Sequence, residues 1–120
     1  MKYMLIIYGN QETWDSFDPE LMAEVIRETD ALNTELAASG ELVGAFGLAD
    51  RVLAQTVRVR DDVPAVTDGP YLESKEYLAS FTIVDCDGLE RALEIAARNP
   101  AARYGQVEVW PILHEAGVEM

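Results

Sequence analysis

The sequence predicts a ferredoxin-like α+β sandwich with an inserted β-hairpin, and three observations lead to this fold class. The 120-residue chain has the length of one domain with a single core, so we expect residues 1–120 to form one domain. Its apolar segments follow the order strand, helix, strand, hairpin, strand, helix, strand. Two strand–helix–strand units on one sheet, joined by right-handed crossovers, give a β-α-β-β-α-β sandwich.

The N-terminal part is expected to form a strand and a long helix. Residues 2–8 are a continuous apolar run of strand length, and a polar loop follows it. Asp18 can cap the free amides of a helix, and Pro19 suits its first turn. An apolar stripe continues to about Ala38, and Gly40 is the expected left-handed stop. The stripe consists of Leu21, Met22, Val25, Ile26, Leu32 and Leu36.

The middle of the chain is expected to be extended. Residues 42–46 are an apolar run that predicts a second strand. Residues 55–60 alternate between valines and polar side chains, residues 61–62 mark a hairpin turn, and residues 64–67 return. After a turn, residues 77–84 form a further apolar strand.

The C-terminal part predicts a second helix and a last strand. Asp87 is placed to cap the helix, and Glu90 is placed to complete a capping box. The helix ends at residues 99–100, where a proline follows an asparagine, and residues 106–113 predict the last strand. The expected apolar stripe of this helix consists of Leu89, Leu93 and Ala96, flanked by Ala92 and Ala97.

In this topology both helices cover the same face of the sheet. The opposite face still carries apolar side chains, so an isolated monomer would expose a large apolar patch. Two copies that pair their sheets face to face remove that patch. The sequence therefore predicts a homodimer with twofold symmetry.

Composition restricts the classes of partner. Hydrophobic residues make up 49% and charged residues 26%, which is typical of a globular protein. The net charge of −13 repels phosphate backbones and anionic membranes, so we expect no nucleic-acid or membrane partner. No apolar run approaches the length that spans a membrane, and we see no signal peptide.

Cysteine and histidine usage points to a cofactor-free protein. Cys86 is the only cysteine, so no intrachain disulfide can form and a cytoplasmic location fits. We expect its thiol to be buried and inert. His114 is the only histidine and lies near the C-terminus, which argues against a transition-metal site. The glycines do not form a phosphate-binding spacing, so no nucleotide cofactor is expected.

The stretch after the hairpin carries the densest set of ionisable groups. Asp68 begins an Asp-Gly-Pro turn, and Glu73, Lys75 and Glu76 follow. A carboxylate beside an ammonium group can orient a substrate or act as a general base. The alternative is a turn followed by a solvated run of charges at the entrance of a strand.

Five other side chains are candidates for a binding site. Tyr71 and Tyr77 flank the charged stretch and could line a pocket or pack in the core. Arg58 shares a strand face with Arg60, where one guanidinium could bind a carboxylate or both could face solvent. Arg103 and Tyr104 lie between the second helix and the last strand, at a place where ligand groups can gather.

Three segments together resemble a known family. Residues 68–76, Asp-Gly-Pro-Tyr-Leu-Glu-Ser-Lys-Glu, resemble the signature of the DGPF-domain proteins of the YCII-related superfamily, with Tyr71 where that family usually has phenylalanine. Residues 1–9 are similar to its first strand, and residues 100–109 to its last helix-to-strand passage. The resemblance implies a dimeric α+β barrel of ferredoxin-like protomers.

The resemblance implies less about chemistry. The wider superfamily resembles small dimeric lyases and isomerases, in which a His–Asp pair has been proposed as catalytic. This chain has no histidine in its first 113 residues, so that pair cannot be transferred. Some family members are associated with sigma factors, but the charge of −13 argues against direct DNA contact here.

The sequence leaves three functional hypotheses open. The first is a binder of a small organic molecule in a cleft near the dimer interface. It could act as a cofactor-independent lyase, isomerase or dehydratase, with Asp68 or Glu73 as base and Lys75 as charge partner, and Tyr71, Glu76, Tyr77, Arg58, Arg103 and Tyr104 would contact the substrate. The second is a non-catalytic binding or regulatory module, associated with a sigma factor. The third is that residues 68–76 shape the dimer and take no part in a reaction.

Overall fold

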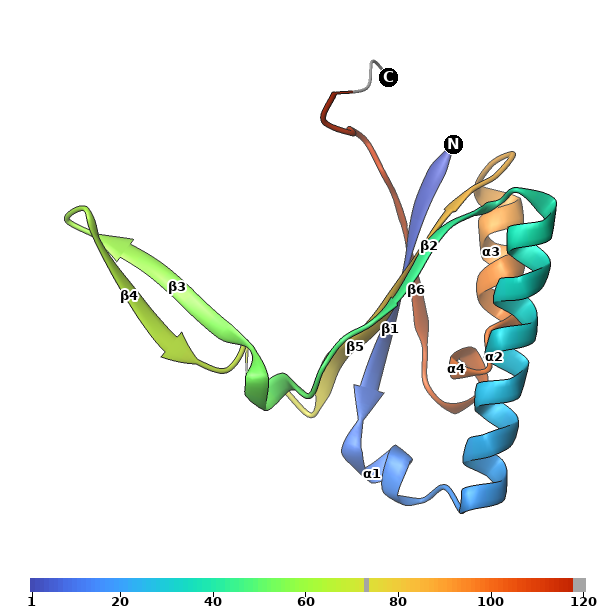
Figure 1. The fold of residues 1–120 in the computed structure, drawn as a ribbon, viewed down its shortest axis with the longest axis horizontal. Coiled ribbons are helices and arrows are strands. Elements are labelled where there is room, and N and C mark those ends of the chain that lie inside the picture. Colours follow the sequence, from blue (N-terminus) through green and yellow to red (C-terminus); the bar gives the residue numbers. More distant parts are fainter. Residues whose placement is uncertain (73, 118–120) are drawn as a thin grey trace.

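Four antiparallel strands in the order β2-β5-β1-β6 form the main sheet of the protein. The structure is a computed structural model, and it describes residues 1–72 and 74–117. The strands are β1 (Lys2–Asn10), β2 (Leu42–Gly47), β5 (Glu76–Asp85) and β6 (Val107–Pro111). Helices α2 (Pro19–Ser39) and α3 (Leu89–Arg98) lie together on one side of this sheet (Figure 1). An α+β fold with an antiparallel sheet is therefore confirmed.

The core lies between the sheet and these two helices. Tyr3 and Leu5 of β1 are buried and alternate with half-buried residues, as expected for a strand with one covered face. Leu36 of α2 and Ile95 of α3 are almost fully buried against them. The remaining buried members of the core are Leu32, Val84, Cys86, Ala92 and Ala96. The expected burial of Cys86 is confirmed.

The predicted ends of α2 are confirmed. The Asp18 side chain accepts a hydrogen bond from the Leu21 amide at 2.7 Å, and Pro19 is the first helical residue. Gly40 has a φ of 80°, in the left-handed region, and its amide donates to carbonyls of the last turn. The predicted stripe differs at Ile26, which is exposed.

The predicted start of α3 is wrong, and its predicted apolar stripe is correct only in part. The cap position is Gly88, which has no side chain to donate or accept, so Asp87 lies one residue too early and no capping box forms. The buried face consists of Ala92, Ile95 and Ala96, so the predicted Ala96 and its flanking Ala92 are buried, whereas Ile95 is buried in place of the predicted leucines. Leu89 and Leu93 are each about half exposed as a consequence.

Two short helices were not predicted. Helix α1 (Gln11–Asp15) occupies the stretch expected to be a loop, and α4 (Ala101–Tyr104) follows the predicted helix stop at residues 99–100. A 3-10 turn at Arg51–Leu53 joins β2 to the hairpin. The Asn10 side chain explains α1, because its Oδ1 accepts from the Glu12 amide at 2.9 Å.

The predicted hairpin forms a separate two-stranded sheet that we call the arm (residues 55–68). Strand β3 (Gln55–Arg60) pairs with β4 (Val63–Asp68) across a turn in which Asp61 and Asp62 both have positive φ. The arm projects on the side of the sheet opposite to α2 and α3 (Figure 1). The radius of gyration of 16.6 Å exceeds the value of about 13.6 Å expected for a compact chain of this length.

The side of the main sheet away from the helices is not covered in the protomer. Paired residues share a face, and here they are largely apolar: Met4 pairs with Trp110, and Phe46 with Phe81. Phe46 and Phe81 rings are 5.1 Å apart. We call this surface the open face (Met4, Ile6, Tyr8, Phe46, Leu78, Phe81, Ile83, Glu108 and Trp110). Among the described residues, no helix combines the length and hydropathy needed to cross a membrane.

Candidate functional site

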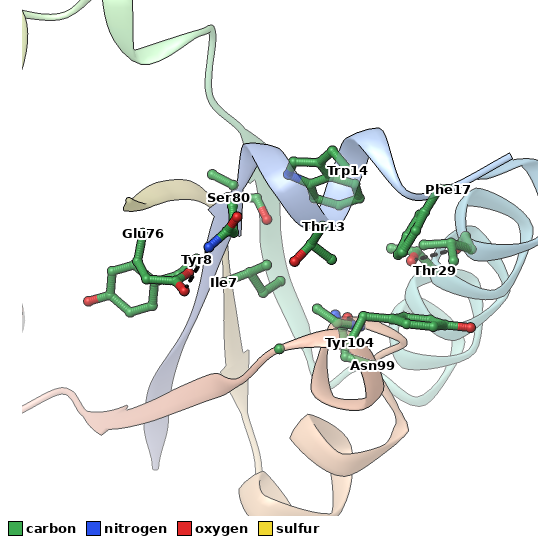
Figure 2. Close-up of a pocket in the computed structure, with 15 residues that line it drawn as sticks. Ile7, Tyr8, Thr13, Trp14, Phe17, Thr29, Glu76, Ser80, Asn99 and Tyr104 are labelled. Carbon is green, nitrogen blue, oxygen red and sulfur yellow. Dashed lines mark hydrogen bonds between the residues drawn. The ribbon is translucent and has the colours of Figure 1, made fainter. Parts of the chain in front are cut away.

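A cavity of about 170 Å³ lies where the ends of β1 and β5 meet α1, α2 and α4 (Figure 2). Its walls come from segments far apart in the sequence, so tertiary packing creates it. The lining residues are Ile7, Tyr8, Asn10, Thr13, Trp14, Phe17, Val25, Thr29, Glu76, Ala79, Ser80, Asn99, Ala101, Tyr104 and Gly105. Most of this surface is apolar or aromatic, with polar groups at separate points.

Three aromatic rings form one wall of the cavity. Phe17 is in edge-to-face contact with Trp14, with ring centres 5.5 Å apart, and with Tyr104 at 4.8 Å. Gly9 permits the packing beside this wall, because a Cβ there would lie 2.8 Å from the Tyr77 ring and 2.9 Å from Trp14 Nε1. A larger residue at this position would displace both rings.

Uncharged polar groups provide hydrogen-bonding positions in the wall. Thr29 Oγ1 donates to the Val25 carbonyl at 2.8 Å, so the hydroxyl oxygen can still accept a hydrogen bond. Asn99 Oδ1 accepts from the Ala101 amide at 2.9 Å, which leaves its NH₂ group as the donor. Thr13 and Ser80 also line the cavity. These groups can orient a hydroxyl or carbonyl of a ligand.

Glu76 is the one carboxylate among the lining residues. It pairs with Asn10 across the last position of the β1–β5 ladder, and Asn10 Nδ2 donates to Glu76 Oε1 at 3.1 Å. The orientation of the Asn10 amide is fixed, because its Oδ1 already caps α1 through the Glu12 amide. The same side chain therefore starts a helix and holds the carboxylate at the edge of the cavity.

A larger hollow of about 720 Å³ lies in the angle between the root of the arm and the open face. We call it the arm-base groove. Its wall includes Tyr71 and Leu72 from the predicted signature and Leu78 from the open face. Arg51 lies over the Tyr77 ring, 5.0 Å from its centre, and donates to the Ser74 carbonyl. Tyr8 and Glu76 line both the groove and the cavity.

The structure divides the predicted site residues between these hollows. Tyr104 lines the cavity, Tyr71 and Tyr77 line the groove, and Glu76 lines both. Arg58 lies on the arm with its guanidinium 5.3 Å from the centre of the Tyr71 ring. Its predicted contact with a ligand stays a prediction.

Two of the three predicted catalytic residues are among the described residues, and both lie outside the cavity and the groove. Asp68 ends β4, is exposed, and accepts from Gln55 Nε2 at 3.4 Å. Lys75 is also exposed, and neither residue lines the cavity or the groove. Glu73 lies outside the described residues. Their catalytic roles stay predictions.

Arg103 is engaged elsewhere. Its guanidinium forms an ion pair with Glu28 at 2.6 Å, and this hydrogen bond raises the pKa of Arg103. It lies 5.7 Å from the ring centre of Tyr104. Arg103 therefore links α4 to α2 beside the cavity.

The model of the YCII-related domain matches residues 1–116 of this sequence. The chain belongs to the YCII-related family. An uncharacterized protein of Rhizobium meliloti (strain 1021) is 29% identical over 116 residues, covering 93% of this chain and 92% of that protein. The predicted membership of the YCII-related superfamily is confirmed, and the narrower DGPF assignment stays a prediction.

In this YCII-related protein, most of the cavity residues were not predicted from the sequence. Trp14 and Phe17 offered the one available signal, two aromatic residues within a polar stretch. Asn10, Thr29 and Asn99 offered none, because each belongs to an ordinary strand end or helix. Their function as lining residues depends on the packing of α1 and α4 against the sheet, and these helices were not predicted.

A hydrogen-bonded group of three side chains lies next to the groove on the open face. Tyr8 Oη donates to Glu108 Oε1 at 3.1 Å, and Trp110 Nε1 donates to the same oxygen at 2.9 Å. Desolvation raises the pKa of Tyr8, and the hydrogen bond to Glu108 raises it further.

Within the described residues, no group of three or more histidine, cysteine, aspartate or glutamate side chains could hold a metal ion.

Proposed function

We propose that this YCII-related protein binds a small, largely apolar organic molecule in the cavity. The observation that carries the proposal is an aromatic-lined cavity of about 170 Å³ with one carboxylate, Glu76, held at its edge by Asn10. A cavity of about 150 Å³ is large enough to hold benzene. Apolar walls with a few oriented polar groups are typical of small-molecule sites.

The lining supports a particular kind of ligand. A flat apolar ring can contact the faces and edges of Trp14, Phe17 and Tyr104. A hydroxyl or carbonyl group on that ring can bond with Thr29 or Asn99. The ligand class that we propose is therefore a small cyclic compound with one or two oxygen substituents.

Proton transfer is the reaction class that the site supports. Glu76 can act as a base because its carboxylate lies at the edge of the cavity, where the hydrogen bond from Asn10 orients it. Isomerisation, elimination and dehydration of an oxygenated ring need such a base and no redox cofactor. Asp68, Glu73 and Lys75 stay proposed partners of Glu76, since all belong to the segment that leads from the arm into β5. A non-catalytic binding module would use the same cavity without turnover.

We also propose a ferredoxin-like fold that forms a homodimer through the open face. The strand order β2-β5-β1-β6, with both long helices on one side, supports the topology. The exposed Phe46, Leu78 and Trp110 support the dimer, because a second copy can cover them. This arrangement agrees with the dimeric barrel that the family resemblance implies.

The fluorescence of Trp14 tests ligand binding in the cavity. The chain has two tryptophans, so the Trp110→Phe variant leaves Trp14 as the single indole reporter. We expect phenol, benzoate, benzaldehyde or cyclohexanone to change its emission saturably. Linear quenching by all four probes would contradict the proposal. Proton NMR of cyclic hydroxyketone probes, with Glu76→Gln as the control, then separates turnover from binding, because it detects isomers as well as dehydration products.

A further inference from the structure

The arm has one face that nothing in the described chain covers. Cross-strand pairing places Val57 opposite Val66 and Val59 opposite Pro64, so these four side chains share a face. Arg58 and Arg60 lie on the other face, and Arg58 stacks on Tyr71. The polar face is therefore in contact with Tyr71 of the same chain through Arg58. All three valines of the apolar face, in contrast, are largely exposed.

Such a ribbon needs support from outside itself. An isolated two-stranded hairpin is at best marginally stable in water. The arm is joined to its own root by the Gly69 amide, which donates to the Ala54 carbonyl at 2.7 Å, and by Thr56 Oγ1, which donates to the Gly69 carbonyl at 2.8 Å. These bonds fix the base of the arm and leave its apolar face bare.

The exposed area of the protomer indicates how much surface a partner must cover. The accessible surface is 8504 Å², whereas a compact monomer of 13.3 kDa is expected to expose about 6,450 Å². The excess is about 2,000 Å² per copy, and a standard interface needs only about 800 Å² from each partner. This excess is larger than a standard interface needs, so the open face and the arm offer enough surface for a second protein chain.

Geometry favours a second copy of the same chain as the partner. The arm projects on the side of the open face, so a body seated on that face lies beside the arm (Figure 1). In a twofold-symmetric dimer, each copy contributes its arm and its open face to the interface. One symmetry operation therefore covers both surfaces in both copies. A different protein would have to be complementary to both the open face and the valine face of the arm, or it would leave one of them exposed.

We propose that the arm of each copy docks through its valine face on the other copy, and that the second copy closes the arm-base groove. This proposal rests on the proposed homodimer, and it identifies the arm as a further element that contacts the second copy. The groove lies between Leu78 of the open face and Tyr71 at the arm root, so a body on that face forms its missing wall. The groove is then a site that needs both copies.

Val66→Asp and Val63→Asp form a matched pair that tests the arm. Both residues are exposed valines of β4, at 58% and 63%, but Val66 lies on the apolar face and Val63 on the arginine face. Sedimentation equilibrium should show that Val66→Asp raises the dimer Kd by about tenfold or more, and that Val63→Asp changes it little. Equal Kd values for both variants and the wild type would overturn the proposal while leaving the dimer intact.

Hydrogen exchange of the unmodified protein provides a second readout if Val66→Asp fails to fold. Backbone amides of residues 55–68 should exchange more slowly at concentrations where the protein is dimeric than after dilution. Exchange in the arm that does not change with concentration would overturn arm docking. A wild-type protein that stays monomeric would overturn both the dimer and arm docking, whereas ligand binding is measured separately through Trp14.

Discussion

Asn10 and Glu76 face each other across the last rung of the β1–β5 ladder, and the Asn10 NH₂ group donates to the Glu76 carboxylate at 3.1 Å. Because the side-chain oxygen of Asn10, Oδ1, also caps α1, one side chain couples the start of that helix to the carboxylate at the cavity. Trp14 belongs to the same helix and forms part of the aromatic wall. The position of the wall and that of the carboxylate therefore depend on a common residue.

Asn10→Ala should lower the free energy of unfolding by about 1 kcal/mol, since it removes a helix cap. Asn10→Asp keeps an oxygen acceptor for the Glu12 amide and should cost less, although it places a second carboxylate beside Glu76. Urea denaturation followed by circular dichroism measures both variants. An Asn10→Ala variant as stable as the wild type would contradict the capping role of Asn10.

Phe46→Asp should dissociate the proposed homodimer into monomers, because it places a charge on the open face. Ile26→Asp is the matched control, because Ile26 is exposed to a similar extent, 54% against 52%, and lies on α2. Sedimentation velocity across micromolar concentrations distinguishes the two species. A Phe46→Asp protein that remains as dimeric as Ile26→Asp would count against an interface at the open face.

The pKa of Tyr8 should lie above its ordinary value of 10.0, chiefly because of desolvation and secondly because of Glu108. Difference titration of phenolate absorbance between the wild type and Tyr8→Phe isolates this group. Glu108→Gln should lower the pKa of Tyr8, since the negative charge beside the hydroxyl is removed, while the desolvation remains. A Tyr8 that titrates at the ordinary value in the wild type would contradict the structure of this cluster.

At the other end of the molecule, Glu41 should make the free energy of unfolding depend on pH. Two nitrogens of Arg91 donate to its carboxylate at 2.9 Å, and this pairing, followed by a hydrogen bond from Ser39, lowers the pKa of Glu41 from 4.5 to about 2. A carboxyl group with a lowered folded-state pKa stabilises the protein above the unfolded value. The stabilisation is lost as the pH falls from 4.5 through about 2.

Glu41→Gln should therefore destabilise the protein at neutral pH and approach the wild type in acid. Urea denaturation over a series of pH values measures the difference. Glu94→Gln is the control, because Glu94 also contacts Arg91 but is largely exposed. A Glu41→Gln deficit that stays constant down to pH of about 2 would contradict the assigned pairing.

The strands and the long helix were predictable because their signals are local. The continuous apolar run of β1, the Asp18 cap and the Gly40 stop of α2, and the paired aspartates of the arm turn each dictate backbone geometry within a few residues. The start of α3 was missed because Gly88, which carries no side chain, takes the cap position. Its buried face was predicted only in part, because Ile95 joins Ala92 and Ala96 in the core while Leu89 and Leu93 are half exposed.

The candidate site was less predictable, because it arises from contacts between distant segments. Residues 68–76 were expected to converge, yet the described structure brings only Glu76 of that segment to the cavity. Asn99 and Thr29 reach the same cavity from α3's end and from α2, and no pattern in the sequence links them. The density of charged side chains predicted that residues 68–76 form the site. Burial and packing, however, determine which of these residues can contact a ligand.

Blocking the cavity tests ligand binding most directly. Ala101→Leu adds bulk to a lining residue of α4, and Ala102→Leu makes the same change one position along, outside the lining. In the Trp110→Phe background, titration of Trp14 fluorescence with the tightest-binding cyclic probe should show at least about tenfold weaker binding for Ala101→Leu and little change for Ala102→Leu. Equal affinity for the two folded variants would show that the probe does not bind in this cavity and would contradict the proposed function.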